Sequence, residues 1–232
     1  MVDNETFREQ WIEKTLKKIP ANSRILDAGA GELSKKKYCK HLQYVSQDFA
    51  QYDGKGDGHG LQTSTWDQRQ LDIISDITAI PVADDSFDAV MCIEVFEHLP
   101  DPLAALREFS RIVRPGGYLI LTAPFCSLTH FAPYHFATGF NRYWYEKHLP
   151  EYGFKIDEIT ANGNFFSYMH QELRRIHYIT KQYSLPKLNI LEKLANRIID
   201  FYFIRNSVKA TQTNELLCFG YQIVAHKIQY EK

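Results

Sequence analysis

Two glycines flanked by acids stand out in the stretch Arg24-Ile-Leu-Asp-Ala-Gly-Ala-Gly-Glu32. A short apolar run that ends in such a turn is typical of a buried parallel strand that leads into a helix. Because Gly29 and Gly31 lack a Cβ, a ligand can lie directly against the main-chain N–H groups of this turn. The stretch therefore predicts a binding site for a nucleotide-like ligand.

The residues around the turn narrow the kind of nucleotide. A dinucleotide site requires Gly-x-Gly-x-x-Gly, but Ser34 stands at the position of the third glycine. Asp27 and Glu32 would repel a pyrophosphate, whereas they suit a ligand that carries an ammonium group and no phosphate. An NAD-dependent oxidoreductase is therefore kept only as a disfavoured alternative.

S-adenosylmethionine is such a ligand, and Ile25-Leu-Asp-Ala-Gly-Ala-Gly-Glu32 resembles the first motif of the class I S-adenosylmethionine-dependent methyltransferases. The resemblance implies S-adenosylmethionine as the cofactor. A glycine turn in some other α/β domain is the alternative that the later motifs must exclude.

Acids recur where the next two predicted strands end. Asp48 lies about 20 positions beyond Asp27, where α/β nucleotide-binding folds place an acid that accepts hydrogen bonds from the ribose hydroxyls. A solvated loop aspartate is the alternative, and we expect the adjacent Phe49 to pack on the adenine. The family resemblance implies that Asp76 accepts a hydrogen bond from the adenine amino group, with the apolar Ile77 beside it.

The most specific resemblance follows the fourth predicted strand. Pro81-Val-Ala-Asp-Asp-Ser-Phe-Asp88 leads into that strand, and Glu94-Val-Phe-Glu-His-Leu-Pro-Asp-Pro102 follows it. Both stretches resemble the small-molecule methyltransferases that include the ubiquinone and menaquinone enzymes. Ligands of open α/β sheets bind outside the carboxyl ends of the strands, so Glu94 should line the cofactor. The resemblance covers roughly residues 23–124.

Composition bounds the remaining possibilities. The 232 residues suffice for one domain, and the net charge of −1 offers no overall positive field for nucleic acid. The amino terminus lacks a signal-peptide core, so we expect a cytoplasmic protein without stable membrane insertion. The four cysteines are far apart, and the Asp53–Gly60 stretch lacks the closing glutamate of a calcium loop, so no metal site is expected.

Periodicity predicts an α/β fold. Further strands are predicted at 44–48, 71–75, 89–93, 118–123, 154–160 and 216–225, with helices at 7–19, 34–40, 102–113, 141–152, 169–181 and 190–204. With the family resemblance, this pattern predicts a Rossmann-like, doubly wound, mostly parallel seven-stranded sheet whose last strand is antiparallel. Residues 1–232 form a single domain in this interpretation. A helical insertion at 165–214 would be a cap over the substrate or the surface of a homodimer.

Histidines are the candidates for proton transfer. Methyl transfer from a sulfonium needs alignment and dehydration, and an oxygen or carbon acceptor also needs a base. His130 and His135 lie in the aromatic loop 125–140, which should face the substrate, and His98 follows the fourth strand. Glu97 and Tyr134 stand behind them as weaker candidates. An ordinary packed or solvated histidine remains the alternative at each position.

Together these patterns predict a methyltransferase that acts on an O, N or C atom of a small-molecule acceptor such as a sugar, a quinone or another metabolite. A nucleic-acid acceptor is disfavoured because no Asn/Asp-Pro-Pro-aromatic element follows the fourth strand. A non-catalytic domain that binds the cofactor and regulates or scaffolds remains an alternative. The residues expected to line the cofactor are Asp27, Gly29, Gly31, Asp48, Phe49, Asp76, Ile77 and Glu94.

Overall fold

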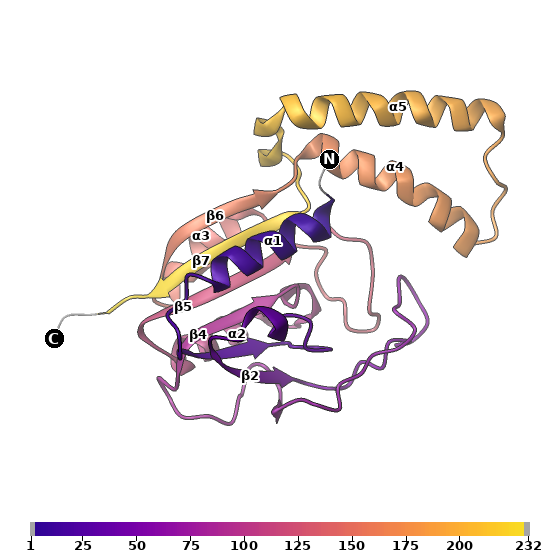
Figure 1. Cartoon of the computed structure of the whole chain (residues 1–232). Helices are drawn as coiled ribbons and strands as arrows, with labels where there is room; N and C mark the ends of the chain where they lie inside the picture. The colour runs from indigo at the N-terminus through magenta and orange to yellow at the C-terminus, as the bar shows by residue number, and fades with distance from the viewer. Residues whose placement is uncertain (1–2, 230–232) are drawn as a thin grey trace.

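A seven-stranded sheet forms the centre of the computed structural model, which describes residues 3–229 (Figure 1). The spatial order is β3-β2-β1-β4-β5-β7-β6, and only β7 runs antiparallel to its neighbours. The predicted fold class is confirmed. The strands are β1 (Arg24–Ala28), β2 (Gln43–Asp48), β3 (Ile73–Ile74), β4 (Phe87–Ile93), β5 (Val113–Pro124), β6 (Phe154–Asn162) and β7 (Gly220–Lys227).

Helices cover both faces of the sheet. Alternate strand residues point to opposite faces, so neighbours such as Ile25 and Leu26 enter different hydrophobic clusters. One cluster packs α1 against β1, β4 and β5, and the other packs α2 and α3 against the opposite face. The helices are α1 (Asn4–Leu16), α2 (Pro102–Ile112), α3 (Arg142–Glu151), α4 (Phe165–Gln182) and α5 (Ile190–Lys209), with 3-10 turns η1 (Lys36–Tyr38), η2 (Phe96–His98) and η3 (Thr211–Glu215).

The helix predicted at 34–40 is only the short turn η1. Three consecutive lysines leave this segment without an apolar stripe, and Lys35 and Lys37 instead form ion pairs with Glu9 of α1. The strand predicted at 71–75 is also shorter, because Asp72 turns aside to accept hydrogen bonds from the backbone and hydroxyl of Ser46 at 2.8 and 2.7 Å. In both segments, contacts with other elements therefore outweigh the local preference, for helix at 34–40 and for strand at 71–75.

Strand boundaries near the end of the sheet also differ from the sequence prediction. The strand expected from 118 begins at Val113, directly after α2, and the last strand begins at Gly220 rather than at Leu216. The segment before Gly220 contains the 3-10 turn η3, which connects the end of α5 to β7.

Helices α4 and α5 lie between β6 and β7 in the chain and form a hairpin that projects beyond the sheet (Figure 1). The Asn164 side chain ties its base by donating to the Ser207 carbonyl, and His170 meets Asp200 at 2.5 Å across the two helices. Much of α5 is exposed, including Ile190 and Phe201 at 82% and 65%. Within residues 3–229, no helix combines the length and hydrophobicity that a bilayer crossing requires.

Candidate cofactor and acceptor site

The Asp48 carboxylate at the end of β2 holds the glycine turn in place. It is only 6% exposed, and its Oδ2 accepts a hydrogen bond from the Gly31 N–H at 2.9 Å. Its Oδ1 accepts from the Ala50 N–H at 3.0 Å and from Gln68 Nε2 at 2.9 Å. The acid that was predicted to bind ribose therefore also joins the first two strand ends.

The glycine turn itself leaves no space for side chains. Gly29 has φ +80°, and a Cβ there would lie 2.4 Å from Cγ2 of Val95. Gly31 has φ +52°, and a Cβ there would lie 2.7 Å from Cζ2 of Trp66. Both positions therefore require glycine, for backbone conformation and for close packing.

Asp27 lies beneath the turn rather than on its surface. It is 2% exposed and accepts a hydrogen bond from the Tyr44 hydroxyl at 2.6 Å. Burial raises the pKa of Asp27 to about 7, although the Tyr44 hydroxyl and the charge of Lys35 oppose this change. The structure thus shows a buried, hydrogen-bonded carboxyl at the position predicted to face an ammonium group.

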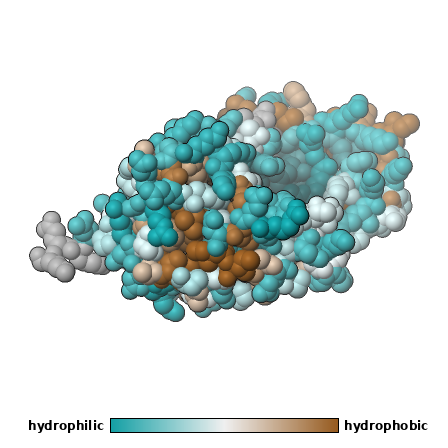
Figure 2. Space-filling model, turned by 60° about the horizontal axis from the view of Figure 1, so that its bottom comes forward, coloured by the Kyte–Doolittle hydropathy of each residue, from teal (hydrophilic) through white to brown (hydrophobic). Residues whose placement is uncertain are grey.

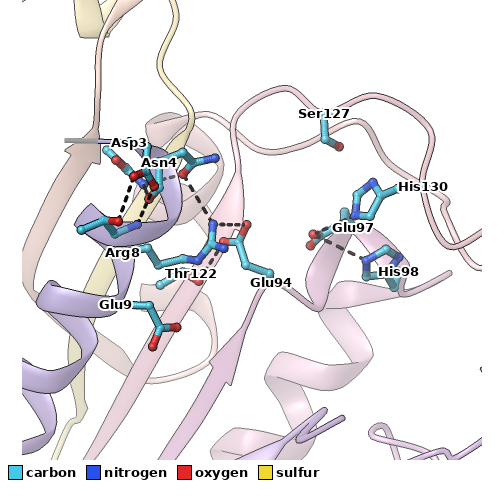
Figure 3. Close-up of polar contacts among 12 residues, drawn as sticks. Asp3, Asn4, Arg8, Glu9, Glu94, Glu97, His98, Thr122, Ser127 and His130 are labelled. Atoms are coloured by element: carbon cyan, nitrogen blue, oxygen red, sulfur yellow. Dashed lines mark hydrogen bonds and ion pairs between the residues drawn. The ribbon is translucent and has the colours of Figure 1, made fainter. Parts of the chain in front are cut away.

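Glu94, at the end of β4, is fixed from two sides (Figure 3). Its Oε1 accepts a hydrogen bond from the Thr122 hydroxyl at 2.8 Å, and its Oε2 forms an ion pair with Arg8 at 3.0 Å. Arg8 belongs to α1, so the first helix reaches the carboxyl end of the sheet. This cation places positive charge beside the carboxylate that was predicted to line the cofactor.

The other predicted cofactor residues are spread more widely. Asp76 is exposed and accepts hydrogen bonds from the backbone and hydroxyl of Thr78 at 2.8 and 2.7 Å. Ile77 is buried in the main hydrophobic cluster, and Phe49 contacts Tyr134 edge-on at 5.0 Å. Their proposed contacts with adenine stay predictions.

The segment 65–69 covers the glycine turn and Asp48. Trp66 lies over Gly31, Gln68 donates to Asp48, and the Asp67 N–H donates to Oε1 of Glu32 at 3.0 Å. A cavity of about 500 Å³ opens here, within the size range of small-ligand sites. It is lined by Glu32, Ala50, Thr65, Trp66, Asp67, Gln68 and Arg69.

These groups fit the nucleoside part of S-adenosylmethionine. The buried Asp48 carboxylate lies behind Gln68, which lines the cavity, and it can accept hydrogen bonds from ribose hydroxyls. Its Oδ1 is held by the Gln68 amide, so a ribose must displace or share this contact. The turn at Gly29 and Gly31 supplies the close approach to backbone that a Cβ would prevent.

A second group of side chains lies on the turn after β4 and the loop after β5. Glu97 is 1% exposed, and its Oε1 lies 3.6 Å from Nε2 of His98 and 3.8 Å from Nε2 of His130 (Figure 3). The rings of His98 and His130 are 4.7 Å apart, and His135 lies 4.8 Å from His130. All three predicted histidines therefore come together, and two of them, His98 and His130, face one buried carboxylate.

The protonation of this cluster follows from burial and mutual charge. Burial lowers the pKa of His98 to about 3, and a charge on His130 acts in the same direction. Burial raises the pKa of Glu97. Burial opposes a charge on His130, but the adjacent Glu97 carboxylate outweighs it and raises the pKa of His130. Burial and His130 lower the pKa of His135, so this imidazole is neutral near pH 7.

Two loops join over these groups. The backbone of Leu61 pairs with the segment around His130, and Tyr52 stacks on Phe131 with ring centroids 4.6 Å apart. Phe131 in turn stacks on His98 at 5.1 Å. The 51–70 loop and the 125–140 loop therefore form a common aromatic cover, which links the cofactor side to the histidines.

Sequence reasoning missed Arg8, Trp66 and Gln68. Arg8 was part of a predicted amphipathic helix, but its partner Glu94 lies 86 positions away and no local pattern links them. Trp66 and Gln68 belong to a loop without periodicity. The sequence offered one indication of their role: a tryptophan and an amide stand in a loop that is otherwise rich in glycine and polar residues, and loops often carry binding residues.

Comparison with known proteins places this geometry in context. Residues 26–121 match a family model described as a methyltransferase domain. A "Ubiquinone biosynthesis O-methyltransferase" of Xanthomonas oryzae pv. oryzae is 36% identical over 105 residues, which cover 44% of this chain and 43% of that protein. The chain therefore covers less than half the length of this relative.

Two solved structures share the fold over nearly the whole chain. A SAM dependent methyltransferase from Archaeoglobus fulgidus has a TM-score of 0.58 and 17% identity, covering 97% of this chain and 95% of its own. The phosphoethanolamine N-methyltransferase 2 of Haemonchus contortus, in complex with S-adenosyl-L-methionine, has a TM-score of 0.56 and 18% identity, covering 96% and 53%. At these identities the likeness shows the fold.

Proposed function

We propose that this chain, which contains a class I S-adenosylmethionine-dependent methyltransferase domain, transfers a methyl group to a hydroxyl oxygen of a small-molecule acceptor. The observation that carries this proposal is the group of three histidines beside the strand ends, two of which face Glu97. A hydroxyl must lose its proton when it is methylated, and imidazole is suited to accept that proton near neutrality.

Residues at the strand ends would hold the cofactor, which supplies an electrophilic methyl group when it is bound. Asp48 would bind the ribose, and the turn at Gly29 and Gly31 would let the cofactor approach the backbone closely. Glu94 would orient the amino-acid portion, with Arg8 fixing the carboxylate and offering a positive charge to the cofactor's own carboxylate. Their role is alignment, which contributes much of the acceleration in such a displacement.

His135 is the best placed proton acceptor of the three histidines. The Ser127 hydroxyl donates to the Thr138 carbonyl at 2.9 Å, so its oxygen accepts from Nε2 of His135 at 3.2 Å. This leaves Nδ1 of the neutral ring free to take a proton from the acceptor hydroxyl. His98 and His130 direct their Nε2 atoms toward Glu97 instead.

We also infer that the hairpin of α4 and α5 caps the acceptor side. The Tyr168 hydroxyl donates to the Cys126 carbonyl at 3.2 Å, and Gln182 Nε2 donates to the Gly60 carbonyl at 3.1 Å. The hairpin thus touches both covering loops. Figure 2 shows a hydrophilic hollow toward the side where the 51–70 loop and the hairpin lie, which supports a polar acceptor.

The test is transfer of a labelled methyl group from S-adenosylmethionine to a metabolite extract and to a panel of hydroxyl compounds. Asp48→Asn should lower cofactor affinity, measured by calorimetry, by about 10-fold or more, because a carboxylate accepts stronger hydrogen bonds than an amide. His135→Asn should lower turnover about 100-fold and leave cofactor affinity unchanged.

Two outcomes would contradict the proposal. Cofactor binding without transfer to any acceptor would favour a regulatory or scaffold domain. Tighter binding of NAD than of S-adenosylmethionine would favour an oxidoreductase. Unchanged turnover in His135→Asn would remove that histidine from the mechanism but would leave methyl transfer intact.

A further inference from the structure

We propose that Glu97, His98 and His130 together bind a divalent transition-metal cation next to the cofactor site. Each of the three side chains offers one ligand atom, and these atoms all lie within 4.8 Å of one another. The binding site stands on this geometry alone. Its suggested role in the reaction rests on the proposed methyl transfer.

The two histidines are oriented as metal ligands are. Nδ1 of His98 lies 2.5 Å from the Tyr134 carbonyl, and Nδ1 of His130 lies 2.9 Å from the Leu128 carbonyl. A carbonyl can only accept, so both Nδ1 atoms carry the proton. In the neutral rings the lone pair is then on Nε2. A backbone carbonyl that fixes the tautomer in this way is a common feature around metal-bound histidines.

Both Nε2 atoms face the same carboxylate oxygen without forming hydrogen bonds. Their distances to Oε1 of Glu97, 3.6 and 3.8 Å, are too long for hydrogen bonds but near the spacing of ligands around one cation. Ligand atoms about 2.1 Å from a tetrahedral ion are separated by about 3.4 Å. The two O···N pairs need to close by only a few tenths of an ångström, whereas the widest pair, at up to 4.8 Å, must close by about an ångström, which rotation of the two imidazoles can supply.

The carboxylate is buried and incompletely satisfied. Glu97 is 1% exposed, and neither its Oε2 nor Nε2 of His98 has a hydrogen-bond partner among the residues that the structure describes. Figure 3 shows the carboxylate beside the two imidazole rings. Burying such groups without partners is costly, and a divalent cation would satisfy both the Glu97 carboxylate and the Nε2 lone pair of His98, with His130 releasing any Nε2 proton when the metal binds.

The ligand set selects the kind of cation. Two imidazoles and one carboxylate suit Zn²⁺, Mn²⁺, Fe²⁺ or Co²⁺ better than Ca²⁺ or Mg²⁺, which prefer oxygen ligands. Three protein ligands leave coordination positions open. A hydroxyl of the acceptor could occupy one of them, and the cation would make it easier for that hydroxyl to lose its proton to His135.

Metal binding should be measured on the whole chain, without cofactor or acceptor. After treatment with a chelator and dialysis, titration with Zn²⁺ and Mn²⁺ by calorimetry should give micromolar or tighter dissociation constants. Co²⁺ should produce visible absorption bands from bound metal. Glu97→Gln and His130→Asn should each weaken binding about 100-fold, whereas Glu151→Gln should change it less than twofold.

Glu151 is a matched control because its carboxylate also lies beside a histidine, with Oε2 at 2.8 Å from Nδ1 of His148. This pair is exposed on α3 and is not part of the buried cluster. Circular dichroism should confirm that each variant is folded, and the partly exposed His130 provides the variant least disturbing to the core. Absence of binding to all three cations in the wild type, or unchanged binding in folded Glu97→Gln or His130→Asn, would overturn the proposal. Cofactor affinity, measured separately, would then still test the methyltransferase function.

Discussion

The strand ends and the loops that cover them differ in how their residues are held. At the strand ends, Asp48 joins two strands through the glycine turn, and Glu94 is fixed by Thr122 and Arg8. The 51–70 loop and the α4–α5 hairpin are linked by single contacts such as that of Gln182 with Gly60. The strand ends are therefore built into the sheet, whereas the link between the hairpin and the 51–70 loop depends on few contacts.

Under the proposed function, this difference would separate cofactor binding from acceptor binding. Groups that must meet the same cofactor in every turnover are fixed by backbone hydrogen bonds and close packing. Groups that choose the acceptor lie on loops, which can vary without disturbing the sheet. Changes at the strand ends should therefore affect stability and cofactor binding, and changes in the cover should affect binding or local opening with little loss of stability.

The largest effect is expected at Gly29. Gly29→Ala should lower the free energy of unfolding by about 3 kcal/mol or more, since the new Cβ meets Val95 in addition to the strained backbone. Gly58→Ala is the matched control, because Gly58 has the same φ of +80° but no atom within 4 Å of a new Cβ. It should cost only about 1 kcal/mol. Urea denaturation measures both, and equal losses would contradict the close-packing argument.

Asp27→Asn should change how stability depends on pH. The folded-state pKa of about 7 lies above the unfolded value, so the wild type loses stability as pH rises from about 4 through 7. The asparagine variant lacks this loss and should gain about 3 kcal/mol relative to the wild type between pH 4 and pH 8. Urea denaturation across this range provides the measurement.

Tyr44→Phe provides a second arm of the same experiment. It removes the hydroxyl that donates to Asp27, which raises the pKa of the buried carboxyl further, so the loss of stability should become larger than in the wild type and should continue to higher pH. Parallel pH profiles for the wild type and Asp27→Asn would show that Asp27 is not responsible for the dependence.

Gln68→Ala tests the cover above the cofactor site. The substitution removes one of the two hydrogen bonds to Oδ1 of Asp48, so S-adenosylmethionine should bind about 3- to 10-fold more tightly, with a stability change below about 1 kcal/mol. Gln70→Ala, an exposed amide two residues away, should leave affinity unchanged. Weaker binding in Gln68→Ala, measured by calorimetry, would indicate that the amide contacts the cofactor directly.

The smallest effect is expected at the tip of the hairpin. Gln182→Ala removes an exposed hydrogen bond to Gly60 and should change the free energy of unfolding by less than about 0.5 kcal/mol. Hydrogen exchange of amides in residues 51–63 should nevertheless become faster, because the cover opens more easily. Gln212→Ala in η3 is the control. Equal exchange in both variants would show that the hairpin does not hold the loop.

Much of the fold could be predicted from local patterns. Alternating burial of neighbours such as Ile25 and Leu26 follows from a strand between two helical layers, and the last, antiparallel strand was expected from the family resemblance. The helix at 34–40 was wrong because Lys35 pairs with Glu9 of another helix. Short segments are decided by such distant contacts, which local propensity does not contain.

The sequence by itself determined which residues stand at each strand end, because strand periodicity and turn chemistry are local properties. The acids Asp48 and Glu94 and the glycines Gly29 and Gly31 were identifiable for that reason. Only the tertiary structure decided what surrounds them. Arg8 reaches Glu94, Gln68 reaches Asp48, and Glu97 gathers histidines from two segments, because the crossovers of the sheet bring distant parts of the chain to one edge.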